Sequence, residues 1–224
     1  MYRDNRITVI VPCLNEEDAI GKVIESIPKL VDEIIIVDNG SEDRTAKIAE
    51  ELGAKVIHEP NRGYGRAYKA GFKNAVGDII ITLDGDHSYP AQDIHLLIDF
   101  LLKKNADFLS ASRFPLKNKE SMSFKHYVGN KMLSFTMCLL FHVWIEDSQS
   151  GMWVFKKNIL DKMKLRSNGM AFSEEIKIEA LIRKDVKFIE KHISYSNRVG
   201  EKKLQPYRDG MKNILFLFKK RFFG

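Results

Sequence analysis

The sequence predicts an α/β fold with a mostly parallel sheet and helices on both faces, and three observations carry this prediction. Short apolar runs alternate with helix-like stretches through the first half of the chain. These runs are apolar throughout, as buried parallel strands are, whereas strands with one solvated face alternate polar and apolar residues. Polar and acidic residues follow three of the runs, at the sheet edge where ligands bind in this class of fold.

The predicted elements alternate along the first half of the chain. Strands are expected at residues 7–11, 33–37, 55–58, 78–83 and 106–111, and helices at 16–27, 44–52, 65–75 and 91–104. The helix over 91–104 has apolar residues at positions 94, 97, 98 and 101, which is the spacing of one buried helical face. Each helix therefore follows a strand, as a parallel sheet requires.

The second half of the chain has a different pattern. Residues 132–145 form a run of 14 residues without a charge, shorter than the roughly 20 apolar residues that a membrane-spanning helix needs. We expect this run as a helix in the core or as a helix lying at an interface. Aromatic, aliphatic and basic residues mix in the last part of the chain, which predicts C-terminal amphipathic helices.

The net charge of +6 lies entirely in the last 27 residues. Residues 198–224 hold eight basic and two acidic residues, and the remaining 197 residues hold 28 of each. A basic and aromatic tail favours an anionic partner such as a membrane surface, and a solvated tail is the alternative. The N-terminus lacks the shape of a signal peptide, and two cysteines make no disulfide framework. These features predict a cytoplasmic protein that is peripheral on the cytoplasmic face of a membrane.

Other motifs that bind nucleotides or metals are absent from the sequence. It contains no G-x-x-x-x-G-K-[ST] phosphate loop, no G-x-G-x-x-G after the first predicted strand, and no Cys/His cluster for zinc. Their absence counts against a nucleoside triphosphatase, a dehydrogenase and a zinc protein.

The candidate site residues follow the predicted strands. Pro12 and Glu16 come after the first, Asp38 to Ser41 after the second, and Asp84 and Asp86 after the fourth. Each group alone is also what a turn or a helix cap favours. Together at one sheet edge, the acids favour a Mg²⁺ or Mn²⁺ site, because these ions bind through one or two carboxylates plus substrate phosphates.

Basic residues mark the predicted acceptor side, with Arg113 after the fifth strand, then Lys125, Arg198 and Lys203. A phosphate monoester has a second pKa of about 6 and is already nucleophilic, so as an acceptor it needs cations to position it. A hydroxyl acceptor would need a carboxylate as general base, and Asp147 is the candidate. The alternative for Asp147 is to brace the turn at 148–151.

Eight collinear motifs resemble those of the family 2 glycosyltransferases, which have the GT-A fold, and especially the dolichyl-phosphate or polyprenyl-phosphate sugar synthases. They are VPCLNEE (11–17), VDNGSEDRT (37–45), EPNRGYGRA (59–67), LDGDHSYP (83–90), SASRF (110–114), GNKMLS (129–134), DSQSGMWVF (147–155) and NRVGEKKLQPYRDGM (197–211). The resemblance covers nearly the whole chain. It implies one GT-A domain over 1–224, with a nucleotide-sugar half (1–115), an acceptor half (116–197) and a membrane-associating tail (198–224).

The resemblance also implies roles for residues. The nucleotide pocket would comprise Pro12, Glu16, Asp38 and Ser41, with Arg62 and Gly65 nearby and Asp84 reaching the diphosphate. Asp84 and Asp86 would hold Mg²⁺ or Mn²⁺, and the implied catalytic group is Asp84, Asp86, Arg113 and Asp147. The acceptor phosphate would meet Arg113, Lys125, Ser150, Arg198 and Lys203.

The implied reaction is an inverting transfer of a hexosyl group from a nucleotide-sugar to dolichyl or polyprenyl phosphate. Mannosyl members of the family usually read Asp-Asp where this chain has Asp38-Asn39, and many relatives read Gly-Phe-Arg where it has Gly151-Met152-Trp153. The Asn39-Gly40-Ser41, Gly63-Tyr64-Gly65 and Asp84-Gly85-Asp86 variants resemble those of members that use UDP-sugars. The resemblance therefore favours UDP-glucose or UDP-N-acetylglucosamine over GDP-mannose.

Two other functions compete with this interpretation. A family 2 transferase acting on a soluble or cell-surface glycan would use Asp147 as its base. A module that binds nucleotides or nucleic acid without catalysis would use the basic tail. We expect no nucleic-acid partner, because the acids at the strand ends would repel a phosphate backbone.

Overall fold

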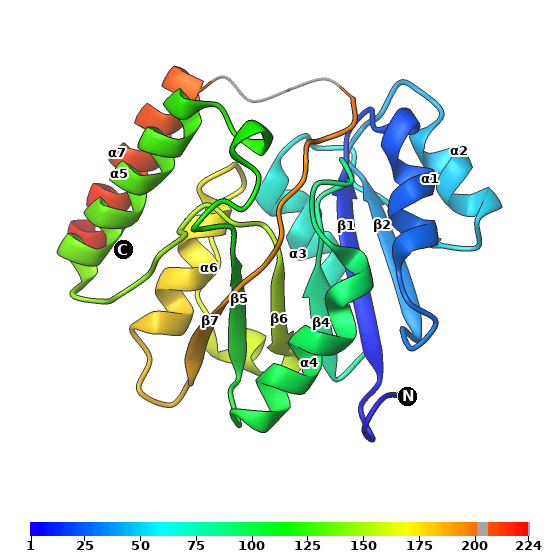
Figure 1. Ribbon diagram of the computed structural model, residues 1–224, viewed down its shortest axis with the longest axis horizontal. Coiled ribbons are helices and arrows are strands. Elements are labelled where there is room, and N and C mark those ends of the chain that lie inside the picture. Colours follow the sequence, from blue (N-terminus) through cyan, green and yellow to red (C-terminus); the bar gives the residue numbers. More distant parts are fainter. Residues whose placement is uncertain (201–205, 224) are drawn as a thin grey trace.

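The structure of the protein, a computed structural model, describes residues 1–200 and 206–223. Its centre is a seven-stranded sheet in the order β3-β2-β1-β4-β6-β5-β7 (Figure 1). The strands are β1 (Ile7–Cys13), β2 (Glu33–Asp38), β3 (Lys55–His58), β4 (Ile79–Thr82), β5 (Phe108–Ser112), β6 (Trp153–Lys156) and β7 (Phe188–His192). Only β6 runs antiparallel to its neighbours among these strands. The predicted α/β fold with a mostly parallel sheet is therefore confirmed.

Helices cover both faces of the sheet. They are α1 (Glu17–Ser26), α2 (Thr45–Glu51), α3 (Tyr64–Asn74), α4 (Ile94–Lys103), α5 (Phe124–Phe141), α6 (Phe172–Leu181) and α7 (Pro206–Phe223). One core cluster joins α1, α2 and α4 to one face, and a second joins α3 and α6 to the other. All the strands and helices predicted in the first half are present, with ends that differ by a few residues. A short 3-10 turn over Ala91–Asp93 precedes α4.

The patterns in the sequence did not predict β6, α6 and β7. Strand β6 lies between β4 and β5 and is antiparallel to both, so it begins near the carboxyl ends of its neighbours. The carboxyl ends of β1, β2, β4, β5 and β7 thus share one edge of the sheet with the start of β6. Every candidate site residue near a strand end is brought to this edge by that topology.

Helices α5 and α7 run side by side at one end of the molecule, next to α6 (Figure 1). Most of the uncharged run at 132–145 belongs to α5, which buries Leu133 and Met137 against α7 and leaves other apolar residues exposed. The run is thus half in the core and half on the surface. Within the described residues, no helix combines the length and the apolar character needed to cross a membrane.

Helix α3 approaches strand β1 closely at Gly71. A Cβ atom at this position would lie 2.5 Å from Cγ2 of Ile10 and 3.2 Å from Cγ2 of Val37. Gly129, in α5, is also helical, but a Cβ atom there would meet nothing within 4 Å.

We therefore expect opposite effects from two substitutions of glycine by alanine. Gly71→Ala should lower the free energy of unfolding by about 1–3 kcal/mol, because overpacking outweighs the helical preference of alanine. Gly129→Ala should raise it by up to about 1 kcal/mol, through helix propensity alone. Urea unfolding of both variants tests this, and equal stability of the two would contradict the close approach of α3 to β1.

Candidate functional site

The acidic turn after β4 is buried at the shared edge of the sheet. The Tyr64 hydroxyl donates a hydrogen bond to Asp84 Oδ1 at 3.2 Å. Gly151 lies against the same carboxylate, since a Cβ atom on it would come within 2.8 Å of Oδ1. Burial raises the pKa of Asp84 to about 7, and the charge of Asp86 adds to this rise. Asp86 is 8% exposed and accepts a hydrogen bond from the Ser88 N–H at 3.0 Å.

The segment after β7 passes over this turn and places a cation beside the acids. The backbone N–H of Val199 donates to the Asp86 carbonyl at 2.9 Å. Arg198 then pairs with two carboxylates, through Nη1 to Asp86 at 3.5 Å and through Nη2 to Glu16 at 3.3 Å. The structure therefore joins a residue predicted for the acceptor phosphate to residues predicted for the metal and the nucleotide.

The loops after β1 and β2 are fastened to each other. The Asn15 N–H donates to Ser41 Oγ at 2.9 Å, and the Ser41 N–H donates to Asp38 Oδ1 at 3.1 Å. Asn39 bonds three backbone groups beyond β3, including the Gly63 N–H at 2.6 Å. These bonds hold the predicted nucleotide residues on adjoining loops. Pro12 lies just before them, near the end of β1.

Two further candidates lie at the start of α3, with Arg62 just before the helix and Gly65 in its first turn. Arg62 is exposed and pairs with Glu42 at 2.7 Å across the entrance to the β2 loop. Gly65 is buried, and a Cβ atom on it would lie 2.5 Å from the Ser167 carbonyl oxygen. Packing against the segment before α6 is thus a sufficient reason for glycine at position 65.

Arg113 and Asp147 form a buried ion pair beside the acidic turn. The Arg113 side chain donates to both oxygens of Asp147, from Nε at 2.7 Å and from Nη2 at 2.8 Å, and its backbone N–H adds a third bond. Burial alone would raise the pKa of Asp147, but the Arg113 charge and hydrogen bonds outweigh it and hold that pKa below its usual range. The charge of Arg113 also opposes the rise in the pKa of Asp84, so the two lie within electrostatic reach.

Lys177 holds the loop that carries Asp147. Its buried ammonium donates to the carbonyl oxygens of Asp147 at 3.1 Å, Ser148 at 2.9 Å and Ser150 at 2.7 Å. Ser150 is fully buried, and its hydroxyl donates to the Ala111 carbonyl in β5. Burial lowers the pKa of Lys177 to about 7, and the charge of Asp147 opposes this shift.

Gln149 connects the same loop to two helices. Its Nε2 donates to Glu174 Oε1 in α6 at 2.7 Å, and its Oε1 accepts from Asn213 Nδ2 in α7 at 3.1 Å. Burial raises the pKa of Glu174 to about 8. The roles of Tyr64, Lys177 and Gln149 were not predicted, because their partners lie far away in the sequence. Tyr64 and Gln149 do lie inside the quoted motifs EPNRGYGRA and DSQSGMWVF, whereas Lys177 lies in none.

Two predicted acceptor residues stay apart from this cluster. Lys125 is exposed in the first turn of α5, and no hydrogen bond or ion pair joins it to the other candidates within the described part of the chain. Lys203 lies outside the described residues.

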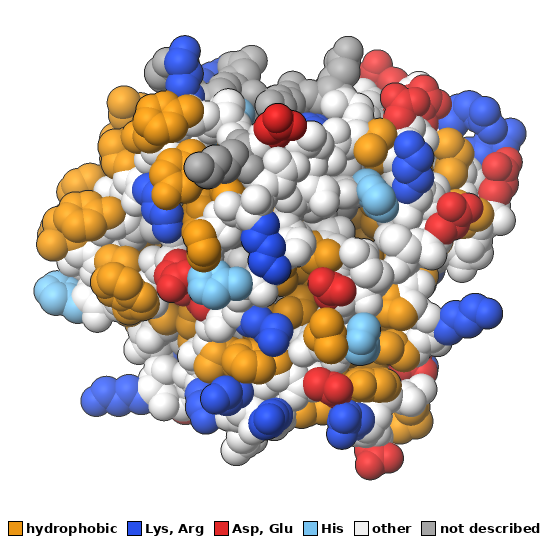
Figure 2. Space-filling view, viewed as in Figure 1, with side chains coloured by type: hydrophobic (Ala, Val, Ile, Leu, Met, Phe, Trp, Pro, Cys, Tyr) orange, Lys and Arg blue, Asp and Glu red, His pale blue; other side chains and the backbone are white. Residues whose placement is uncertain are grey.

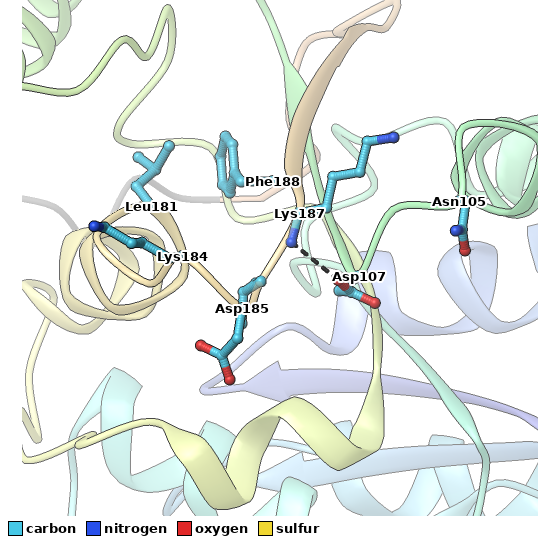
Figure 3. A pocket seen from close by; sticks show the side chains of 8 residues that line it. Asn105, Asp107, Leu181, Lys184, Asp185, Lys187 and Phe188 are labelled. Carbon is cyan, nitrogen blue, oxygen red and sulfur yellow. Dashed lines mark hydrogen bonds between the residues drawn. The ribbon is translucent and has the colours of Figure 1, made fainter.

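A surface pocket at the opposite edge of the sheet is not part of this site (Figure 3). It lies where β5 and β7 begin. Asp107 there accepts the Lys187 N–H at 2.9 Å and pairs with Lys156 at 2.9 Å. Both carboxylates of this pocket, Asp107 and Asp185, are thus paired within the protein, and none of the predicted site residues lines it.

The acidic turn fits a divalent cation bound jointly with a phosphate. Within residues 1–200 and 206–223, no group of three or more His, Cys, Asp or Glu side chains could hold a metal alone. The acidic turn itself offers two carboxylates, Asp84 and Asp86. Mg²⁺ and Mn²⁺ accept such incomplete oxygen sets and complete them with substrate phosphates and water.

Comparison with known proteins identifies the family. Residues 8–164 match the family described as "Glycosyl transferase family 2". The dolichyl-phosphate hexose transferase of Haloferax volcanii is 31% identical over 212 residues, covering 93% of this chain and 91% of that protein. The low-salt glycan biosynthesis hexosyltransferase Agl6 of the same organism is 32% identical over 218 residues, and this chain spans only about half (52%) of its length.

Solved structures agree on the fold. Glucosyl-3-phosphoglycerate synthase from Mycobacterium tuberculosis in complex with UDP has a TM-score of 0.77 at 20% identity, covering 97% of this chain and 80% of that one. The complex of that enzyme with Mn²⁺, UDP and glucosyl-3-phosphoglycerate has a TM-score of 0.72. The fold is of the GT-A type. The chain belongs to glycosyl transferase family 2.

The buried ion pair predicts a large stability effect of Asp147→Asn. The substitution leaves the Arg113 charge buried beside a neutral group, and we expect a loss of about 3–5 kcal/mol in the free energy of unfolding. Asp185→Asn is the matched control, because Asp185 is about half exposed in its pairs with Lys162 and Arg183. Exposed pairs contribute little, so this variant should unfold like the unmodified protein. Similar losses in urea unfolding of the two variants would contradict the role assigned to the pair.

The raised pKa of Asp84 predicts a pH-dependent metal affinity. Below a pKa of about 7 the carboxyl is protonated and must lose its proton to bind a cation. We expect the Mn²⁺ affinity to fall up to roughly tenfold per pH unit below that value and to level off above it. Calorimetric titration at several pH values measures this. Asp84→Asn should weaken binding and flatten the profile, and a flat profile in the unmodified protein would exclude Asp84 as a ligand.

Proposed function

We propose that this protein transfers a hexosyl group from a nucleotide-sugar to dolichyl or polyprenyl phosphate, with inversion at the anomeric carbon. UDP-glucose or UDP-N-acetylglucosamine is the favoured donor, and GDP-mannose is the alternative. One observation supports the proposal: the acidic turn at Asp84 lies against Gly151, in the loop whose Asp147 holds the Arg113 guanidinium through two hydrogen bonds. This edge of the sheet can receive a cation–diphosphate group on one side and a phosphate on the other.

On the donor side, the joined loops after β1 and β2 support a nucleoside pocket that includes Pro12, Glu16, Asp38 and Ser41. Asp84 and Asp86 would hold Mg²⁺ or Mn²⁺, and the cation, when bound, would offset the negative charge that develops on the departing nucleoside diphosphate. Arg198 lies between Glu16 and Asp86 and would add a second positive charge next to the diphosphate.

On the acceptor side, the Arg113–Asp147 pair supports a phosphate over a hydroxyl. Both oxygens of Asp147 accept hydrogen bonds from Arg113, and its pKa is held low. A carboxylate in that state is a poor general base, so the pair counts against the glycan-hydroxyl alternative. A phosphate dianion needs no base. Arg113, fixed in orientation by Asp147, would position it.

The relatives support the same chemistry. One is a dolichyl-phosphate hexose transferase that aligns with almost the full length of this chain. Another, from Methanococcus voltae, is a UDP-N-acetylglucosamine–dolichyl-phosphate N-acetylglucosaminyltransferase, 35% identical over 180 residues and covering 70% of this chain and 72% of that protein. The solved structures of similar fold contain UDP and Mn²⁺. We extend this chemistry to the present chain, placed on the cytoplasmic face of a membrane where such acceptors lie.

A transfer assay tests the proposal. Purified protein with Mg²⁺ or Mn²⁺ is given radiolabelled UDP- and GDP-sugars and a polyprenyl phosphate. We expect label from one donor to enter the organic phase, chelator to stop it, and Asp86→Asn to reduce the rate by roughly 10²–10³-fold, as loss of one key electrostatic group does. The control variant Asp185→Asn should keep full activity. Label that stays in water with every donor, while the protein is folded, would refute the lipid-phosphate acceptor.

A further inference from the structure

Lys220, near the end of α7, has a buried side chain, unlike the lysine next to it in the sequence. Figure 2 shows Lys and Arg side chains standing out from the surface over most of the face in view, and Lys219 is likewise exposed. The Lys220 side chain is only 11% exposed, and its ammonium lies between two acids of α6, 2.6 Å from Glu179 Oε1 and 3.5 Å from Glu175 Oε1. Both carboxylates are buried, so this cation offsets charges that are costly in a protein interior.

The same two carboxylates hold the chain segment that precedes α6. Through their other oxygens, Glu179 accepts the Lys164 N–H at 3.0 Å and Glu175 accepts the Ser167 N–H at 2.7 Å. Each acid therefore binds Lys220 with one oxygen and the backbone of residues 164–168 with the other. Because each carboxylate is shared in this way, the position of the segment depends on where Lys220 holds the two acids.

The segment at 164–168 in turn caps the start of α3. The N-cap residue of α3 is Gly63, which has no side chain that could cap the helix. The backbone carbonyl of Asn168 instead accepts the N–H groups of Gly65 at 3.1 Å and of Arg66 at 3.3 Å. These are donors that the start of a helix leaves without an intrahelical partner. The first turn of α3 is therefore held in place by a backbone group of the segment.

The first turn of α3 also contacts both parts of the predicted donor side. The Gly63 N–H donates to Asn39 Oδ1, in the loop after β2, at 2.6 Å. The Tyr64 hydroxyl donates to Asp84 Oδ1, in the acidic turn after β4, at 3.2 Å. A continuous series of ion pairs and hydrogen bonds thus connects α7, through α6 and the segment at 164–168, with the loops that we expect to bind the nucleotide-sugar.

We propose that Lys220 is a positioning residue for the nucleotide-sugar, which acts through Glu175 and Glu179 on the start of α3. Lys220 itself lies on α7, outside the group of residues predicted to bind the nucleotide. Donor affinity would still depend on it, because small displacements of the groups that orient a substrate are costly. This inference rests on the proposed function, since it requires a nucleotide-sugar at this edge of the sheet.

The alternative is that Lys220 only joins α7 to α6. Its loss would then lower the stability of the protein and leave the start of α3 and the donor affinity of the folded molecules unchanged. Two measurements on the full chain separate these roles, one of them without any substrate.

Hydrogen exchange of the unliganded protein tests the connection between the helices. Lys220→Met removes the charge, Lys220→Arg keeps it, and Lys219→Met is the matched control at the exposed neighbouring lysine. We expect the Gly65 and Arg66 amides to exchange roughly tenfold faster in Lys220→Met. They should exchange at the unmodified rate in the other two variants, because arginine can pair with both carboxylates. Unchanged exchange of these amides in Lys220→Met would overturn the proposal.

Steady-state transfer to a water-soluble short-chain polyprenyl phosphate tests the positioning role. With the donor that the transfer assay accepts, we expect Lys220→Met to raise the donor KM roughly three- to tenfold. The acceptor KM should stay unchanged, and Lys220→Arg should restore the donor KM. Equal rises in both KM values, or an unchanged donor KM in the folded variant, would overturn the positioning role. If Lys220→Met does not fold, Lys220→Gln, whose amide still donates a hydrogen bond, takes its place with the same expected results.

The two experiments fail in different ways. Transfer with an unchanged donor KM in Lys220→Met would overturn this inference and leave the proposed function intact. A protein that shows the expected exchange but transfers sugar to no polyprenyl phosphate would refute the proposed function. Calorimetric binding of UDP with Mn²⁺ then tests the positioning role without transfer, and equal UDP affinity of Lys220→Met and the unmodified protein would overturn it.

Discussion

Two buried cations, Lys177 and Arg113, hold the loop at 147–150, and the connection between β5 and β6 depends on them. The ammonium of Lys177, in α6, donates hydrogen bonds to three carbonyl oxygens of this loop. The guanidinium of Arg113, just after β5, donates to both carboxylate oxygens of Asp147. Each charge is isolated from water, so either would be costly to bury without its partners. These hydrogen bonds therefore hold the loop in one conformation and fix the direction of the Arg113 guanidinium. Strand β6 begins shortly after this loop and pairs antiparallel with both β4 and β5.

Around the ends of β1, β2 and β4, the loops are held by close contacts between backbone segments and not by buried charges. Asn39 fastens the β2 loop to the segment before α3, and Gly151 lets the loop before β6 lie against Asp84 without a side chain between them. These contacts bring three strand ends within reach of one ligand. The acidic turn then carries a real electrostatic cost, visible in the raised pKa of Asp84, which a bound cation would relieve.

Helices α6 and α7 are joined to the loop at 147–150 and to each other by polar contacts. Gln149 accepts from α7 and donates to α6, and Lys220 of α7 pairs with Glu179 of α6 at 2.6 Å. The inner side of the α5–α7 pair is thus joined to the loop at 147–150 by polar contacts, from Asn213 to Gln149 and between Ser134 and Ser148.

The sequence by itself determined the order of strands and helices over the first half, because wholly apolar runs and helical spacing are local signals of buried strands and one-sided helices. It also determined the acidic strand ends and, through eight collinear motifs, the family. It did not determine α6, because that helix buries Ser173, Glu174, Glu175 and Lys177 and so lacks a polar face that periodicity could detect. Only the tertiary structure decided that Asp147 serves Arg113, that Arg198 reaches back to Glu16 and Asp86, and that α5 is half exposed. Those outcomes depend on which distant residues the topology brings together, and pairing between buried charges has no periodic trace in the sequence.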